Sequence, residues 1–179
     1  EWGAYLLSSI RWPSDEKFGG EFHLDYRSKR GVGLGPTLNY RSDKWGDGYL
    51  NLYRAFDDDP LTDSRGLAID RERDLAQWSH RLRQGDFTAT AVMEYESDEF
   101  MRRDFYEDLY QNNVQPNTYL ELSHDWENYN LSMLVQPRVN AFYENIDRVP
   151  DFKLSGTRHR IGDSPFFYDT ETSVGYLRH

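Results

Sequence analysis

DFTATAVMEYESDEFMRRDFY, residues 86–106, divides into an alternating half and a polar half. In the first half apolar and more polar residues alternate, so one side carries Phe87, Ala89, Ala91, Met93 and Tyr95. A period of two over about ten residues predicts a β-strand with two unlike faces. The second half starts at Glu96-Ser97-Asp98 and predicts a long polar loop. This arrangement is typical of an outer-membrane barrel strand, but the segment alone is equally consistent with a long strand of a soluble sheet.

The same alternation recurs along the chain and predicts an all-β fold. It is most regular in residues 20–28, where Phe22, Leu24 and Tyr26 alternate with charged residues. Turn residues separate such segments, and neither a βαβ pattern nor an internal repeat is present. We therefore expect an antiparallel up-and-down meander of about ten strands, as a sector of a large transmembrane β-barrel. The expected strands cover residues 20–28, 33–41, 49–56, 74–83, 86–96, 117–126, 129–140, 151–160 and 166–178; they follow a lead-in at 1–19, which is extended over 1–12 and broken at 13–17.

The predicted connections sort by length. Tight turns at Gln84-Gly85 and Glu127-Asn128 define one rim of the sheet. The long connections 57–73, 97–116 and 141–150 then fall on the opposite rim, together with one short turn at 28–31. Outer-membrane barrels show this asymmetry between short inner turns and long outer loops. The connection 97–116 also predicts a short amphipathic helix containing Phe100, Phe105, Tyr106, Leu109 and Tyr110.

Composition limits the classes of function. The chain has 179 residues, a net charge of −10 and no cysteine, which disfavours nucleic acid as a partner and excludes disulfides and thiolate chemistry. Mean hydropathy is −0.88, so no apolar run approaches a transmembrane helix, whereas barrel strands average to such values because their two faces differ. Aromatic residues make up 16% and suit either an interfacial girdle or a carbohydrate-binding protein. The absence of an initiator Met and a final segment that ends without a turn lead us to expect a piece of a longer protein.

No catalytic or metal-binding pattern stands out. The acidic residues around the second long loop are expected to be solvated; they are Glu94, Glu96, Asp98, Glu99, Asp104, Glu107 and Asp108. The run Asp57-Asp58-Asp59 lacks the spacing of a calcium loop. The histidines show no zinc motif, and Gly31-Val32-Gly33-Leu34-Gly35 continues as a strand rather than as a phosphate loop. We expect neither an enzyme nor a bound cofactor or metal.

Several of these segments together resemble LptD, the outer-membrane lipopolysaccharide (LPS) assembly family. The resemblance begins with EFHLDYRSKRG at 21–31 and LGPTLNYR at 34–41. It continues, in the same order, through Trp78-Ser79-His80, Tyr95-Glu96-Ser97-Asp98, Phe100 with Asp104-Phe105, and Arg148-Val149-Pro150. The order of motifs holds over residues 21–178. The chain departs from the family in lacking its periplasmic jelly-roll domain and its cysteines, and in having fewer strands.

The resemblance implies a protein of the Gram-negative outer membrane that inserts lipopolysaccharide into the outer leaflet. It implies a plug lipoprotein similar to LptE, periplasmic LPS-bridge proteins and outer-membrane lipid as partners. It also implies a lateral opening between the first and last strands of the barrel, with 20–28 as the first strand. The residues expected to face the lumen beside that opening are Glu21, His23, Asp25, Arg27 and Pro36. Pro36 lacks an N–H, so we expect strand 33–41 to lie at an edge or to pair weakly on one side.

Two alternatives remain open: a soluble carbohydrate-binding or glycan-processing β-protein, and a general porin-like barrel. The positions of the apolar residues separate the membrane interpretations from the soluble one. In a membrane barrel they form an outward belt, whereas in a soluble protein they pack into a closed core. The residues expected to face lipid are Phe87, Ala89, Ala91, Met93, Leu131, Met133 and Val135.

Overall fold

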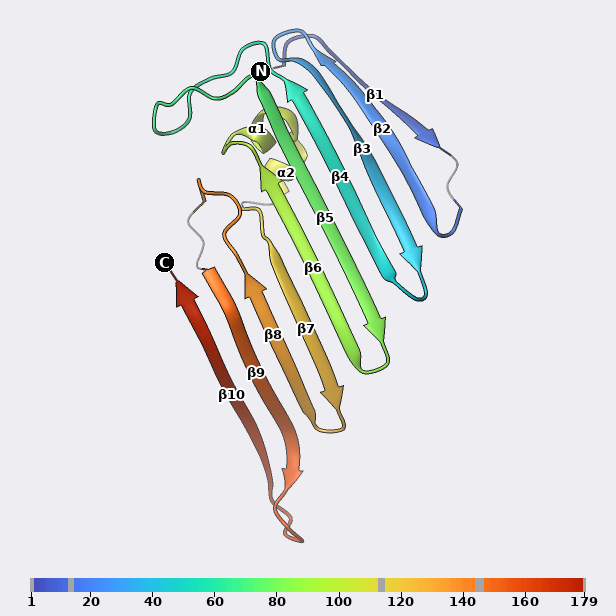
Figure 1. The fold of residues 1–179 in the computed structure, drawn as a ribbon, viewed down its shortest axis with the longest axis vertical. Helices are drawn as coiled ribbons and strands as arrows, with labels where there is room; N and C mark the ends of the chain where they lie inside the picture. The colour runs from blue at the N-terminus through green and yellow to red at the C-terminus, as the bar shows by residue number, and fades with distance from the viewer. Residues whose placement is uncertain (1, 13–14, 113–114, 144–146, 179) are drawn as a thin grey trace.

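A computed structural model describes residues 2–12, 15–112, 115–143 and 147–178, and in these residues ten strands form one antiparallel sheet (Figure 1). Every strand pairs with its neighbours in the sequence, in the order β1 to β10. The all-β antiparallel meander expected from the sequence is therefore confirmed. The strands are β1 Tyr5–Trp12, β2 Phe18–Arg27, β3 Gly31–Ser42, β4 Gly46–Phe56, β5 Glu72–Gln84, β6 Phe87–Glu96, β7 Tyr119–Trp126, β8 Tyr129–Gln136, β9 Asp147–Arg160 and β10 Phe167–Arg178.

The sheet is open within the described residues. The outer edges of β1 and β10 pair with no other described strand, so these residues show a sheet and not a closed barrel. Short turns join β3 to β4, β5 to β6 and β7 to β8 at one end of the sheet. The longer connections after β4, β6 and β8 lie at the other end, so the predicted sorting of loops by length is confirmed (Figure 1).

The N-terminal segment corrects one expectation. Residues 5–12, which we assigned to a lead-in, form β1 and pair with β2 from Tyr5↔Arg27 to Trp12↔Gly20. Strand β2 is consequently not the first strand of the sheet. The expected break at 13–17 falls partly on residues 13 and 14, which lie outside the described residues, as do 144–146 of the expected loop 141–150. Strand β9 begins earlier than expected, at Asp147.

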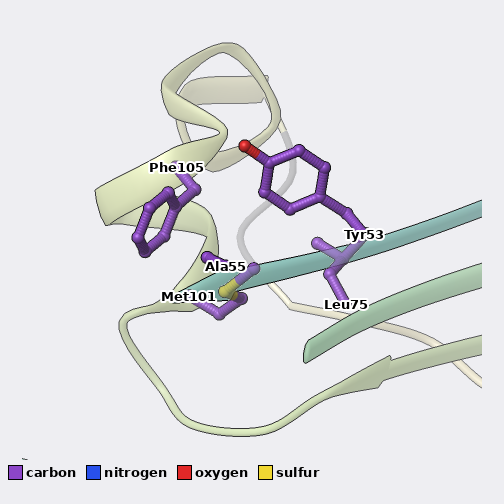
Figure 2. Packing of buried hydrophobic residues seen from close by; sticks show 5 residues of the cluster. All are labelled: Tyr53, Ala55, Leu75, Met101 and Phe105. Carbon is purple, nitrogen blue, oxygen red and sulfur yellow. The ribbon is translucent and has the colours of Figure 1, made fainter. Parts of the chain in front are cut away.

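The connection between β6 and β7 folds back against the sheet. It contains two short helices, α1 Met101–Phe105 and α2 Glu107–Asn112, so the predicted amphipathic helix is present in two parts. Met101 and Phe105 of α1 pack against Tyr53 and Ala55 of β4 and Leu75 of β5 (Figure 2). This small cluster is the hydrophobic core among the described residues, and it lies at the long-loop end of one face of the sheet.

A glycine on β3 makes room for this core. Gly33 lies beside Tyr53, and a Cβ built on Gly33 would overlap the phenol ring and hydroxyl of Tyr53. The Tyr53 side chain is 3% exposed and its hydroxyl donates to Asp25, so the ring has little freedom to move away. The glycine is therefore required by the close approach of the ring.

We predict that Gly33→Ala lowers the free energy of unfolding by about 1–3 kcal/mol, because the added methyl group overpacks a filled site. Urea unfolding followed by tryptophan fluorescence measures the change. Gly175→Ala is the matched control, since there the nearest atoms belong to the movable carboxylate of Asp151. Equal stability of the Gly33→Ala variant and the parent chain would contradict this account of the packing.

Candidate functional site

One face of the sheet, hereafter the apolar face, carries continuous rows of apolar side chains. Residues directly opposite each other on paired strands share a face, so registers trace such rows across the sheet. One row crosses six strands, β5 to β10, and consists of Leu82, Ala89, Leu122, Met133, Phe152 and Val174. A second row crosses β3 to β6 and consists of Leu38, Leu50, Trp78 and Met93.

Residues one position further along the same strands point to the opposite face of the sheet, hereafter the polar face, and most of them are polar. The adjacent row consists of Arg83, Thr88, Ser123, Ser132, Lys153 and Ser173. Helix α1 packs on this face, because its partners Tyr53 and Leu75 lie there. From β5 to β10 the two faces of the same sheet thus present unlike chemistry.

No described layer covers the apolar face. Leu24, Leu52 and Phe152 lie away from the ends of their strands, yet they are 52%, 39% and 44% exposed. The seven residues expected to face lipid all lie on this face and are half-buried or exposed, outside the core cluster. They are Phe87, Ala89, Ala91, Met93, Leu131, Met133 and Val135.

Both ends of the apolar face change character. At the short-turn end, histidines lie among aromatic rings: His80 stacks on Tyr40 and Trp78, and His124 contacts Trp126 edge to face. At the long-loop end, Arg54 forms a bidentate ion pair with Asp74, with N–O distances of 2.7 and 2.8 Å. The apolar belt is therefore bounded by amphipathic rings at one end and by an ion pair at the other.

The residues expected beside a lateral opening divide between the two faces. Glu21, His23, Asp25 and Arg27 all lie on the polar face, as expected. Pro36 does not, because it pairs directly with Phe22 and so belongs to the apolar face. Strand β3 is also interior rather than an edge. The expected weak pairing is nevertheless present on one side, since the β3–β4 register passes from Leu34↔Arg54 to Thr37↔Asn51 without pairing Pro36.

A cluster of buried charges, hereafter the charged lock, joins the long loops to the polar face. At its centre Arg73 of β5 is fully buried and donates to Asp57 and Asp104 at 2.7 and 2.9 Å. It also donates to both oxygens of Asp98, at 2.9 and 2.7 Å. Arg73 therefore links the starts of two loops to helix α1 through one side chain.

Three more arginines complete the charged lock. Arg30, in the β2–β3 turn, donates to Asp57 at 3.1 Å and lies 3.5 Å from Asp104. Arg27 donates to the hydroxyl of Tyr53 at 2.9 Å and to the carbonyl of Phe105 at 3.3 Å. On the other side of α1, Arg102 forms a buried ion pair with Glu96 at the end of β6. Charge-assisted hydrogen bonds such as those from Arg27 and Arg30 are stronger than neutral ones. Together with the ion pair of Arg102 they hold α1 on the polar face from several directions.

The burial and the arginine neighbours of Asp104 determine the pKa of its carboxyl group. Burial alone would raise the pKa of this carboxyl group, but hydrogen bonds from Arg103 and Arg73 and the charge of Arg30 outweigh burial and lower the pKa below 3.8. Asp104 is therefore ionised at neutral pH and contributes to stability as an anion. Nearby, burial raises the pKa of Tyr106, so the hydroxyl of Tyr106 keeps its proton.

The structure corrects the expectation that the acidic residues around the second long loop are solvated. Glu96 and Asp104 are 1% and 6% exposed, because each is paired with arginine. Asp57 of the preceding loop is likewise 1% exposed. Glu107 and Asp108 are exposed, as expected. Among the described residues, no group of three His, Asp or Glu is arranged to hold a metal ion, and no helix is long and apolar enough to span a membrane.

The charged lock was missed from sequence because its members are far apart in the chain. The only local signal is that Arg73 directly precedes Asp74 and Arg102 lies two residues before Asp104. The resemblance motifs Tyr95–Asp98 and Asp104-Phe105 coincide with the lock, because Glu96, Asp98 and Asp104 are three of its carboxylates.

No model of a known protein family matches the sequence, and comparison with curated proteins gives no significant match. The class that the described residues define is an antiparallel meander sheet with one apolar and one polar face.

We predict that Asp104→Asn loosens α1 at neutral pH. The variant keeps the shape of the side chain but removes the charge that Arg73 and Arg30 share, at a cost of about 1–3 kcal/mol. Hydrogen–deuterium exchange of the residues around α1 measures the loss as faster exchange. Asp108→Asn, an exposed carboxylate on α2, is the control and should leave exchange unchanged; equal exchange in both variants would refute the anchoring role.

We also predict that the stability of the α1 region depends on pH. Because the pKa of Asp104 in the folded chain is lowered from 3.8, the stabilisation is fully present above pH 3.8 and is lost as the pH falls through the lower, folded value. Pepsin cleavage near α1 should therefore accelerate below about pH 4, the ordinary range of aspartate. In Asp104→Asn this acceleration should be smaller. If cleavage of the variant accelerated as much as cleavage of the parent chain, Asp104 would not be the group whose protonation loosens α1.

Proposed function

We propose that this chain is a sector of an outer-membrane β-barrel that inserts lipopolysaccharide into the outer leaflet. The observation that supports location in a membrane is the pair of adjacent rows of side chains across β5 to β10, one apolar and one polar. A transmembrane barrel needs this arrangement, because its outer surface meets hydrocarbon while its lumen is hydrated. In a soluble protein an apolar face of this width requires a second layer.

The bounds of the apolar face and the sorting of the loops support the same proposal. Aromatic rings are favoured at membrane interfaces, which suits Tyr40, Trp78 and Trp126 at the short-turn end. In this orientation the short turns face the periplasm and the long loops face outward. Helices α1 and α2 then narrow the outer end of the lumen, and the charged lock holds α1 there.

The lipopolysaccharide part of the proposal is supported by the resemblance to the LptD family. The partners that follow are lipopolysaccharide itself, a plug lipoprotein similar to LptE, periplasmic LPS-bridge proteins and outer-membrane lipid. Because β1 precedes β2, the exposed edge of β1 replaces β2 as the candidate side of a lateral opening. Ile10 and Leu6 on this strand are 72% and 67% exposed, which suits contact with a lipid or with a further strand.

Membrane contact is tested by two adjacent residues on β8. Met133 lies on the apolar face and Ser132 on the polar face. We predict that Met133→Lys reduces folding into liposomes by about 2–4 kcal/mol, the cost of lysine facing the middle of a bilayer, while Ser132→Lys has little effect. The protease-protected fraction gives the measurement. Equal effects of the two variants, or a stable monomer without detergent or lipid, would favour a soluble β-protein.

Crosslinking from a residue on the polar face tests whether lipopolysaccharide is the substrate. We predict that a photoreactive benzoylphenylalanine in place of His23 crosslinks to lipopolysaccharide in cells, because the proposal places His23 at the lumen wall. The same group at Met133 is the comparison, since any protein in an outer membrane meets lipopolysaccharide on its outside. Crosslinking from Met133 without crosslinking from His23 would favour a general porin-like barrel.

A further inference from the structure

A pocket of about 650 Å³ lies at the short-turn end of the polar face. Residues 15–17, the described part of the β1–β2 connection, form one wall, and the carbonyl of Lys17 accepts from the N–H of Arg41 at 2.7 Å. Gly19 of β2 lies opposite Asn39 and has no side chain to fill the hollow. The volume falls within the usual range of pockets for small ligands. The floor is a row of uncharged polar side chains on adjacent strands: Asn39, Tyr49 and Ser79.

Two arginines beside this row are without a partner in the described part of the chain. Arg41 of β3 and Arg81 of β5 both lie directly opposite Asp47 of β4, and all three residues line the pocket. Neither guanidinium makes a hydrogen bond or an ion pair with the described residues, Asp47 included. Paired strands are about 4.8 Å apart, so the two arginines begin roughly 10 Å apart on the same face. Their long side chains can therefore reach one ligand group from two sides.

The acidic residues of the pocket do not cancel these charges. Glu21 is already paired with Arg11 at 2.9 Å, and Asp15 accepts from two backbone N–H groups of its own turn. The acidic residues that remain are Glu16 and Asp47, both exposed. The two free arginines and the lysine of the wall outnumber them, so the pocket favours an anion. Because Asp47 lies between the arginines, a ligand with two negative charges gains more there than a ligand with one.

We propose that this pocket binds a phosphate monoester. Such a group carries about −1.5 to −2 charges at pH 7 and has three strong acceptor oxygens. Arginine forms bidentate hydrogen bonds with phosphate, so Arg41 and Arg81 can each bind different oxygens of one phosphate. The hydroxyls of Tyr49 and Ser79 in the adjacent row are further donors. The site goes beyond the proposed function, because it does not require the apolar face to contact lipid.

The test is binding to the chain in maltoside micelles, a detergent without phosphate, measured by calorimetry and ³¹P NMR. The probes are glucose 6-phosphate, a soluble monoester, and phosphatidic acid, a lipid monoester; sodium acetate is the comparison. We expect at least one monoester to bind more tightly than acetate. Binding of glucose 6-phosphate supports a soluble ligand, and binding of phosphatidic acid alone supports a lipid headgroup.

Three variants locate the site. We expect Arg81→Gln to weaken binding of the monoester at least tenfold and Asp47→Asn to strengthen it. Arg81 has no partner among the described residues, so its replacement should keep the fold, which circular dichroism verifies. Arg83→Gln is the matched control, since Arg83 is exposed two residues further along the same face and does not line the pocket.

Three results would overturn the proposal: no binding of either monoester, equal binding of acetate, or an equal loss in Arg83→Gln and Arg81→Gln, which would indicate general surface charge. The outcome is independent of the Met133→Lys experiment. Binding of a monoester by a chain that does not insert into liposomes would leave the pocket standing and remove the proposed function.

Discussion

Side chains on a β-strand must alternate between two faces, and every part of this structure depends on keeping that alternation in register across ten strands. A shift of one residue at any pairing would exchange apolar and polar side chains on all the strands beyond it. From β5 to β10 the row from Leu82 to Val174 stays apolar while the neighbouring row from Arg83 to Ser173 stays polar. The register shifts in the β8–β9 and β9–β10 pairings lie outside these two rows. The sheet therefore keeps an apolar face and a polar face apart.

The charged lock holds a polar loop, the segment containing α1, against the polar face of the sheet. Hydrophobic packing contributes little there, because among the described residues the core cluster is small and consists of Tyr53, Ala55, Leu75, Met101 and Phe105, with Tyr106 packed against it. Buried arginines take the place of a larger core by pairing with carboxylates from several loops. Removing one partner of a buried pair is costly, because the remaining charge stays desolvated. Specific position of α1, rather than large stability, is the expected consequence.

Much of the fold was predictable from sequence, because both the period of two and the turn residues are local signals. These local signals predict strands β2 to β10 and the order of long and short connections. They also predict which face of the sheet carries Glu21 and which carries Met133. The pairing of β1 was not predictable in this way, since an extended segment shows no partner in its own sequence. Pro36 was expected at the lumen because its missing N–H suggested a weakly paired seam, whereas its alternation with Gly35 and Thr37 puts it on the apolar face opposite Phe22. The lock was missed because ion pairs between distant residues leave only charges in the sequence.

The central claim is that one face of the sheet meets lipid and the other meets water. The chain contains no cysteine, so single spin labels can be attached in turn to cysteines introduced at residues 129–136 of β8, and the accessibility of each label to oxygen and to a nickel chelate can be measured in liposomes. We expect an alternation with a period of two, with labels at 131, 133 and 135 accessible to oxygen and labels at 130, 132 and 134 accessible to the chelate. Chelate access at every position would contradict the claim.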